Sequence, residues 1–485
     1  MLLNKRVLLA VNALHAHLQS TRAELNANAE VIEKLFRHRA QVRLQRSRSA
    51  GSRQKRQRKS WNEFQGKLSD RGFRHMFRMP RDCFTRLCRS IESNVGAEEF
   101  KSEEYLESLK KGHVGLNGST RMNHAQTHGI GTGGFVSGEV KLALTLRSMA
   151  GGSYLDLSML YEVGHIYAYE IFHHVLEKWI CDDRLVSING EEYLNDEEKL
   201  KAVAEGFVNN EDQCILGGII GALDGWLVKI GKPNKRTDGV KNVGGYWSRK
   251  GYYAINVQVI VDRKKRILYR SILCRGAEHD STAFKASSLY RILEEKASWL
   301  ASKGWYLIGD SAYSIRSFLQ VPYDNAQHDT PEDNFNFVHS SRRIFVECAF
   351  GEIDMRWGIF WKPLKFSLKH NCTIIDAGLR LHNFIVNDRE EERLLVGGGM
   401  SANEERNLFS SECIAYMTVN PTAVFGVFGG EGEERGDTTV GRPDQWKLAG
   451  KQLRDALRDR LHEANIRRPL ANWFRSRANH MIIND

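Results

Sequence analysis

Three acidic residues stand in apolar stretches of the sequence, where a charged side chain needs a compensating partner. Asp224 ends an apolar run and is followed by Gly225, Asp310 ends a second apolar run, and Glu347 lies between apolar residues of a helical pattern. Removing a carboxylate from water is costly unless it is paired, protonated or bound to a cation. Glycines beside Asp224 also allow a ligand to approach the backbone closely.

An Asp, Asp, Glu set matches the needs of a two-metal catalytic site. Two Mg²⁺ or Mn²⁺ ions about 3.5–4 Å apart require hard oxygen ligands that converge from rigid elements. One ion lowers the pKa of a water or of a DNA 3′-hydroxyl, and the other stabilises the leaving oxygen of the scissile phosphate. From the residues alone, an ordinary explanation stays open, because aspartates at strand ends also form turns and helix caps.

The elements that would position these acids follow from the hydrophobic period. Apolar or alternating runs rich in β-branched and aromatic residues predict strands at residues 215–230, 252–262, 266–274 and 305–309. Helical periodicity predicts helices at residues 281–302 and 341–358. Asp224 and Asp310 are therefore expected at strand ends and Glu347 on a helix. Together these segments predict a mixed α/β unit over residues 213–388.

An all-α region is predicted before this unit, over residues 61–185. Helices are expected from residue 137 to the glycines at 151 and 152, at residues 154–161 and at residues 165–179. Helix, glycine-containing turn and helix is the outline of a helix-turn-helix that reads DNA. An ordinary small helical bundle explains the same pattern, and both interpretations stay open.

Positive charge is concentrated near the N-terminus. The formal net charge is +11 over 485 residues, and eleven cations with no acid among them lie at residues 34–59. We predict a helix and a basic linker over residues 1–60, and a charged, partly flexible region over residues 389–485 with a helix at 444–464. The basic run favours DNA or nuclear import over a merely solvated tail. Candidate DNA contacts are Arg53, Lys55, Arg56, Arg58, Lys59, Arg249 and Lys250, although the last two also fit a solvated hairpin edge.

Several other functions are disfavoured. The glycines at 217, 218, 221 and 225 do not form the G-x-G-x-x-G fingerprint of dinucleotide sites. No run of eighteen apolar residues occurs, so no transmembrane helix is expected. No ligand-spaced His or Cys accompanies His382, which favours a packing role over metal binding.

Six sequence blocks in register give the chain a resemblance to a known family. They are ALDG at 222–225, RKGYYAINVQ at 249–258, RGAEHDS at 275–281, IGDSAY at 308–313, VECAFG at 346–351 and LHNF at 381–384. Residues 215–385 thereby resemble the DDE endonuclease domain of PIF/Harbinger transposases. The resemblance implies an α/β, RNase H-like mixed sheet flanked by helices, preceded by a helix-turn-helix-like region.

Carried over residue by residue, the resemblance makes Asp224, Asp310 and Glu347 the three catalytic acids and metal ligands. Asp280 matches another acidic position of the family and becomes a fourth candidate ligand, while the N-cap of the following helix explains it equally well. Cys348 stands where a basic or polar residue is commoner. Glu352 and Asp354 make the segment after the third acid unusually acidic.

The resemblance implies a nuclear DNA endonuclease or transposase that uses Mg²⁺ or Mn²⁺ to hydrolyse phosphodiester bonds. DNA is the implied substrate, a Myb-like protein the implied partner, and assembly into a homo-oligomer is left open. A domesticated DNA-binding or scaffold protein that no longer cleaves is the alternative. Intact acids at all three positions favour the enzyme.

Overall fold

The computed structural model describes residues 60–105, 136–208, 216–395 and 445–467. The described residues belong to one compact unit. The predicted N-terminal helix, and a basic linker carrying Arg53, Lys55, Arg56, Arg58 and Lys59, lie outside the described residues. The boundary that we predict between the helical region and the α/β unit stays a prediction.

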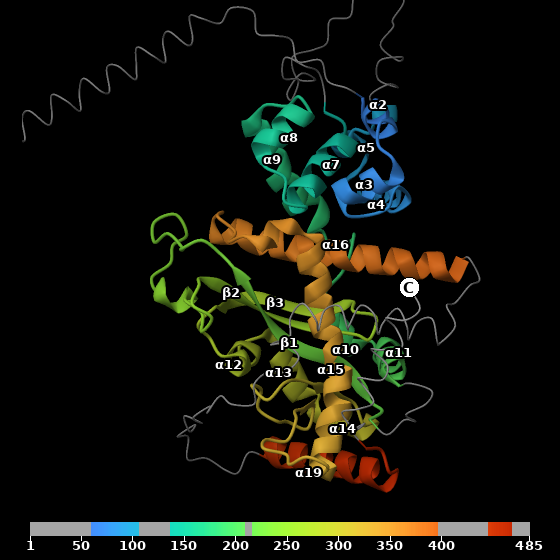
Figure 1. The fold of residues 1–485 in the computed structure, drawn as a ribbon, viewed down its shortest axis with the longest axis vertical. Coiled ribbons are helices and arrows are strands. Elements are labelled where there is room, and N and C mark those ends of the chain that lie inside the picture. Colours follow the sequence, from blue (N-terminus) through green and yellow to red (C-terminus); the bar gives the residue numbers. More distant parts are fainter. Residues whose placement is uncertain (1–59, 106–135, 209–215, 396–444, 468–485) are drawn as a thin grey trace, which may run out of the picture. The chain divides into compact units, whose positions relative to one another are not determined.

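A five-stranded mixed sheet forms the centre of the α/β unit, with the order β3-β2-β1-β4-β5 (Figure 1). Its strands are β1 (Ile219–Lys229), β2 (Ala254–Val261), β3 (Ile267–Arg275), β4 (Tyr306–Ile308) and β5 (Leu319–Gln320). The first three pair antiparallel, and β4 and β5 continue the sheet in parallel. All eight residues of β2 are buried, which is expected of a central strand with helices on both faces.

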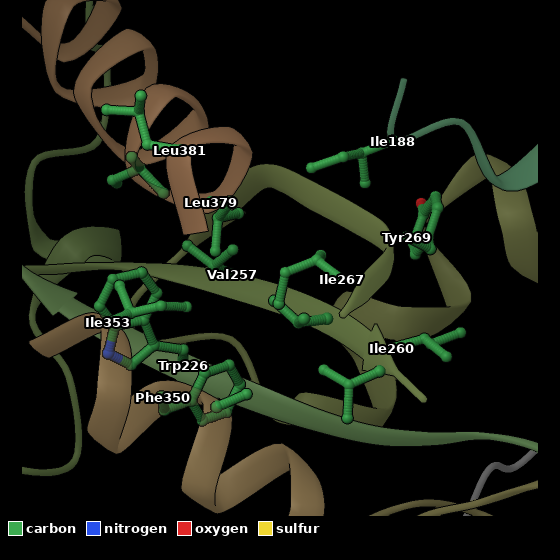
Figure 2. Close-up of a cluster of buried hydrophobic side chains, with 14 of the residues drawn as sticks. Ile188, Trp226, Val257, Ile260, Ile267, Tyr269, Phe350, Ile353, Leu379 and Leu381 are labelled. Carbon is green, nitrogen blue, oxygen red and sulfur yellow. The ribbon is translucent and has the colours of Figure 1, made fainter. Parts of the chain in front are cut away.

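Helices cover both faces of this sheet. The two long helices α15 (Pro331–Arg356) and α16 (Leu368–Leu395) contact β1 and β3, respectively. Figure 2 shows Trp226 and Val257 of the sheet lying near Phe350 and Ile353 of α15 in this core. The shorter helices are α10 (Gly190–Asn195), α11 (Glu197–Phe207), α12 (Asp280–Lys285), α13 (Ser288–Glu295) and α14 (Ala297–Lys303). Mixed strand directions and helices on both faces are those of an RNase H-like fold, so the predicted fold class is confirmed.

Two predicted helices have different bounds in the structure. α15 begins ten residues before the predicted start, because Thr330 caps it by accepting a hydrogen bond from Asp333 N and Pro331 occupies its first turn. The single helix predicted at residues 281–302 is three short helices. One break lies at Ser287, whose side chain caps α13 by accepting from Tyr290 N. α10 and α11 lie between residues 185 and 213, where we predicted no helix.

The helical region agrees with the prediction in its later part. The helices before the sheet are α2 (Trp61–Gly66), α3 (Asp70–Phe77), α4 (Arg81–Val95), α5 (Ala97–Phe100), α7 (Gly138–Met149), α8 (Tyr154–Leu160) and α9 (His165–His174), which continues as the π-helical η2 (Val175–Ile180). Ser137 caps α7. Arg86 of α4 forms an ion pair with Asp388 of α16, whose side chain is only 6% exposed. The helical region therefore packs on the α/β unit through α16.

The predicted C-terminal helix is present as α19 (Gln445–Glu463), and it packs against α15 and β5. Its Arg454 guanidinium lies 3.9 Å from the ring centroid of Tyr323, and the Tyr323 hydroxyl donates a hydrogen bond to Asp455. In the described part of the chain, no helix combines the length and the apolar character that a membrane span requires.

Candidate active site

Asp224 lies in the interior of β1, which continues for five residues to Lys229, so the predicted position at a strand end is wrong. The strand continues because residues 222–229 all pair with β2. Side chains alternate along a strand, so Asp224 shares a face with Trp226. Trp226 stacks on Phe350 of α15 with ring centroids 5.8 Å apart. Asp224 therefore faces the helix that carries Glu347.

One guanidinium joins two of the predicted acids. Arg343 Nη1 lies 3.2 Å from Asp224 Oδ2, and Arg343 Nη2 contacts Glu347 Oε1. Arg343 and Glu347 are four residues apart on α15, a spacing that places them on the same helical face. All three side chains are at most 19% exposed. Residues far apart in the chain thus meet at one point.

Asp310 reaches the same level of the sheet from the neighbouring parallel strand. Ala222 of β1 pairs with Ile308 of β4, so Asp224 and Asp310 each stand two residues beyond a paired position. Asp310 follows the end of β4, as predicted, and its Oδ1 accepts a hydrogen bond from Ala312 N at 3.0 Å. This bond fixes the turn that carries the carboxylate.

The pKa values of the three acids reflect their shared surroundings. Burial raises the pKa of Asp224 to about 7, Arg343 opposes this rise, and the charges of Asp310 and Glu347 add to it. Burial likewise raises the pKa of Asp310 and that of Glu347 above their usual values, again against the effect of Arg343. Three carboxylates near one guanidinium leave negative charge uncompensated, which is the electrostatic condition of a cation site.

Asp280 stands apart from the pairing of Arg343 with Asp224 and Glu347. Gly225 is the residue after Asp224, so a Cβ added to it would point to the opposite face of β1. That Cβ would lie 2.2 Å from Asp280 Oδ1, so Asp280 lies on the opposite face. The charge of Asp280 nevertheless contributes, after burial, to the raised pKa of Asp310.

Two amide side chains of β2 hold Asp280 in this place. Its Oδ1 accepts hydrogen bonds from Asn256 Nδ2 at 2.9 Å and from Gln258 Nε2 at 3.2 Å. The N-cap explanation fails, because His279 is the N-cap residue of α12 and Asp280 is its first helical residue. Asp280 is therefore already hydrogen-bonded within the protein, and its role as a fourth ligand stays a prediction.

The donor set suits a hard divalent cation by its chemistry. Asp224, Asp310 and Glu347 supply carboxylate oxygens, the ligands that Mg²⁺ and Mn²⁺ prefer. As they are placed in the described residues, no three His, Cys, Asp or Glu side chains form a group that could hold a metal ion. Arg343 pairs with two of the acids, so binding of an ion by all three requires the guanidinium to give way.

The remaining sequence candidates are placed as follows. Arg249 and Lys250 are exposed in the connection between β1 and β2, and Arg249 Nη2 lies 3.4 Å from Asp280 Oδ2. His382 is fully buried and its Nε2 donates to the carbonyl oxygen of Lys265 at 2.8 Å, as its expected packing role requires. The sequence reasoning missed Arg343, although a cation four residues before an acid in an apolar helix was a readable signal.

The surface of α8 and α9 differs from that of a DNA-reading motif. No Lys or Arg occurs at residues 148–177, which contain four acidic residues. Large apolar side chains are exposed there instead, namely Tyr154, Leu155, Met159, Leu160, Ile166 and Tyr169. DNA phosphates are bound by cations, so this composition favours the helical-bundle interpretation over DNA reading by α9.

Comparison with known proteins finds similarity over the part of the chain that carries the three acids. Residues 223–383 match the family model of the DDE superfamily endonuclease. A protein of Arabidopsis thaliana described as "Protein ALP1-like" is 26% identical over 155 residues, which is 29% of this chain and 37% of that relative. The chain thus spans little more than a third of the length of this relative. No solved structure matches the chain. The matched residues 223–383 contain Asp224, Asp310 and Glu347, so all three acids lie in a segment that is similar to the DDE superfamily endonuclease domain.

Proposed function

We propose that the protein is a divalent-metal-dependent DNA endonuclease of the PIF/Harbinger transposase type. The observation that supports this best is the convergence of Asp224, Asp310 and Glu347 from β1, the β4 turn and α15. Bound Mg²⁺ or Mn²⁺ would supply an activated water or 3′-hydroxyl and stabilise the leaving oxygen. The three carboxylates would hold the ions, and the rigid strand and helix backbones would fix their geometry. A nuclear location and a Myb-like partner are part of this proposal.

Plasmid nicking by the full-length chain in Mn²⁺ tests the proposal. We expect Asp224→Ala and Glu347→Ala to lower the nicking rate by about 100-fold or more, because each removes a metal ligand. Glu332→Ala is the matched control, since Glu332 is an acid in the first turn of the same helix and pairs with Arg458. Equal nicking by all four proteins would contradict the proposal, and a matched RNA duplex tests whether the substrate is DNA.

A second candidate is a DNA-associated protein that keeps the fold without cleaving. The pairing of Arg343 with both Asp224 and Glu347 favours it, because this guanidinium already compensates two of the acids. Calorimetric titration with Mn²⁺ separates the two candidates. The endonuclease binds Mn²⁺ and loses this binding in Asp224→Ala, whereas the non-cleaving protein binds no Mn²⁺ at this position.

A further inference from the structure

The connection between β1 and β2, residues 230–253, carries a concentrated positive charge, and we call it the basic connection. It contains one acidic residue, Asp238, and six exposed cations, which are Lys232, Lys235, Arg236, Lys241, Arg249 and Lys250. The surface of α8 and α9 shows the reverse, since it carries acids and no Lys or Arg. Such a local excess of cations favours a polyanionic ligand.

Most of these cations have no acidic partner within the described residues. Among the residues that the structure describes, Arg249 alone of the six pairs with an acid, Asp280, and its side chain is still 65% exposed. Asp238 does not neutralise the others, because its carboxylate accepts hydrogen bonds from the backbone N of Asn234 at 2.7 Å and of Leu368 at 3.0 Å. Five cations are therefore available to phosphates at no cost in broken ion pairs.

The basic connection is held in place by its backbone. Gly231 N donates to Leu364 O at 2.7 Å, and Ala277 N donates to Gly245 O at 3.0 Å. Together with the Asp238–Leu368 bond, these contacts attach the connection to two neighbouring segments, at Ala277 and at Leu364–Leu368. A segment that is already ordered loses little entropy on binding, so its charges are presented in a fixed arrangement.

An exposed aromatic residue stands among the cations. Trp247 is 50% exposed, and its ring meets that of Tyr253 edge-on, with centroids 4.9 Å apart and an interplanar angle of 77°. Exposed aromatic side chains next to cations form the stacking platforms on which proteins bind unpaired bases. A solvated hairpin edge needs no tryptophan at this position.

The basic connection leads to the acidic site. Arg249 pairs with Asp280, and a Cβ built on Gly225 would lie 2.2 Å from Asp280 Oδ1, so Asp280 lies directly against β1. Gly225 is the residue after Asp224. The end of the basic connection that carries Arg249 therefore lies beside the part of β1 that carries Asp224.

We propose that the basic connection binds the DNA strand beside the cleavage site, with its cations on phosphates and Trp247 stacked on an unpaired base. This inference rests on the proposed function and assigns it a substrate form, DNA with unpaired bases next to the scissile phosphate. Lys232, Lys235, Arg236, Lys241 and Lys250 contact the backbone irrespective of sequence. Trp247 distinguishes unpaired from paired bases.

Fluorescence anisotropy with labelled DNA in EDTA, using the full chain, tests the phosphate contacts. We expect the triple variant Lys235→Gln/Arg236→Gln/Lys241→Gln to reduce the slope of log Kd against log salt by about 3, since each phosphate contact contributes about 0.9. The control triple Arg89→Gln/Lys201→Gln/Lys451→Gln removes the same charge from exposed positions on α4, α11 and α19. Equal slopes for the two triple variants would show a net-charge effect and overturn the inference.

Trp247→Ala tests the stacking on the same DNA. We expect about a tenfold loss of affinity for DNA with unpaired bases, because an aromatic platform stabilises an unpaired base, and little change for a fully paired duplex. Trp247→Phe retains most of the affinity. Trp361→Ala is the matched control, as Trp361 is 61% exposed and lies outside the basic connection. An equal loss for paired and unpaired DNA refutes the stacking role.

The nicking assay keeps the two proposals apart. A wild-type protein that binds unpaired DNA through the basic connection but does not nick plasmid in Mn²⁺ contradicts the endonuclease and supports the binding element. A protein that nicks normally while the connection variants bind like wild type contradicts the binding element alone. Melting curves of each variant confirm that it is folded, which these exposed positions allow.

Discussion

At the scale of single residues, the site is defined by an imbalance between acids and cations. Arg343 compensates Asp224 and Glu347, while Asp310 adds a third carboxylate whose pKa is also raised, chiefly by burial. A protein selected only for stability has little reason to gather acids in this way, since an uncompensated buried charge destabilises the folded state. The arrangement is typical of a functional site, where residues needed for activity lower the stability of the fold.

Because of Asp224, we expect the stability of the folded state to depend on pH in a direction that can be measured. Its pKa is raised from 3.8 in the unfolded chain to about 7 in the folded one, so the folded state binds the extra proton between about pH 4 and pH 7. Stability is therefore gained as the pH falls through this window and lost as it rises. Between about pH 5 and pH 8, in EDTA, we expect wild type to lose about 2–3 kcal/mol relative to Asp224→Asn.

Urea unfolding at several pH values measures this difference. The amide introduced by Asp224→Asn cannot titrate, so subtracting the two curves removes the contribution of groups that do not interact with Asp224 and leaves that of Asp224 with its coupled neighbours. A difference between wild type and Asp224→Asn that does not change with pH would mean that the acid is fully compensated by Arg343.

At the scale of elements, the two faces of β1 contact different parts of the site. One face presents Asp224 to α15, and the other is kept clear at Gly225 for the carboxylate of Asp280. Tyr313, which follows the Asp310 turn, donates to Gln258 Oε1 at 2.7 Å, and Gln258 in turn contacts Asp280. The neighbouring strand β2, the turn and α12 are thus connected by side-chain hydrogen bonds through Gln258.

Gly225→Ala tests whether this arrangement is tightly packed. The added Cβ would lie 2.2 Å from Asp280 Oδ1 and 2.8 Å from Gln258 Nε2, so both side chains must move. We expect a loss of about 1–3 kcal/mol in the free energy of unfolding, as for other overpacked sites. Chemical denaturation measures it.

Gly206→Ala is the matched control for this substitution. Its Cβ would have nothing within 4 Å and it lies in α11, where alanine is the better helix former. This variant should be as stable as wild type or more stable. Equal effects at the two glycines would show that the space beside β1 is not limiting.

At the scale of the whole molecule, helices that precede and follow the sheet in the sequence pack on the α/β unit. Arg86 of α4 pairs with Asp388 of α16, and α19 packs on α15, the helix that carries Arg343 and Glu347. The C-terminal region, which we expected to be partly flexible, therefore contributes one helix to the folded unit. Substitutions in α19 are expected to act on global stability.

Two leucines of α19 allow this to be checked with one kind of substitution. Leu457 is 2% exposed and Leu448 is 58% exposed. We expect Leu457→Ala to lower the free energy of unfolding by about 2–5 kcal/mol, the usual cost of a cavity in a core, and Leu448→Ala to have little effect. If thermal melting finds both variants as stable as wild type, α19 does not contribute to the core of the unit.

The sequence by itself determined the element types and the identity of the acids. Periodicity located four of the five strands, the helices α7 to α9 and α19, because an element that buries one face repeats apolar residues at its own period. The two-residue strand β5 is too short to show such a repeat. The start of α15 was missed although Thr330 and Pro331 signal it, because Phe335 and Phe337 alternate with polar residues and do not follow a helical spacing.

Only the tertiary structure decided how the acids are compensated. Pairing across the sheet placed Asp224 inside β1, set Asp310 level with it, and left the Gly225 side of the strand to Asp280, because strand register fixes which side each residue takes. The pairing of Arg343 with an acid 119 residues away is a contact that no local pattern contains. Residue types therefore predicted the chemistry, whereas register and helix packing decided which of the predicted acids share one guanidinium.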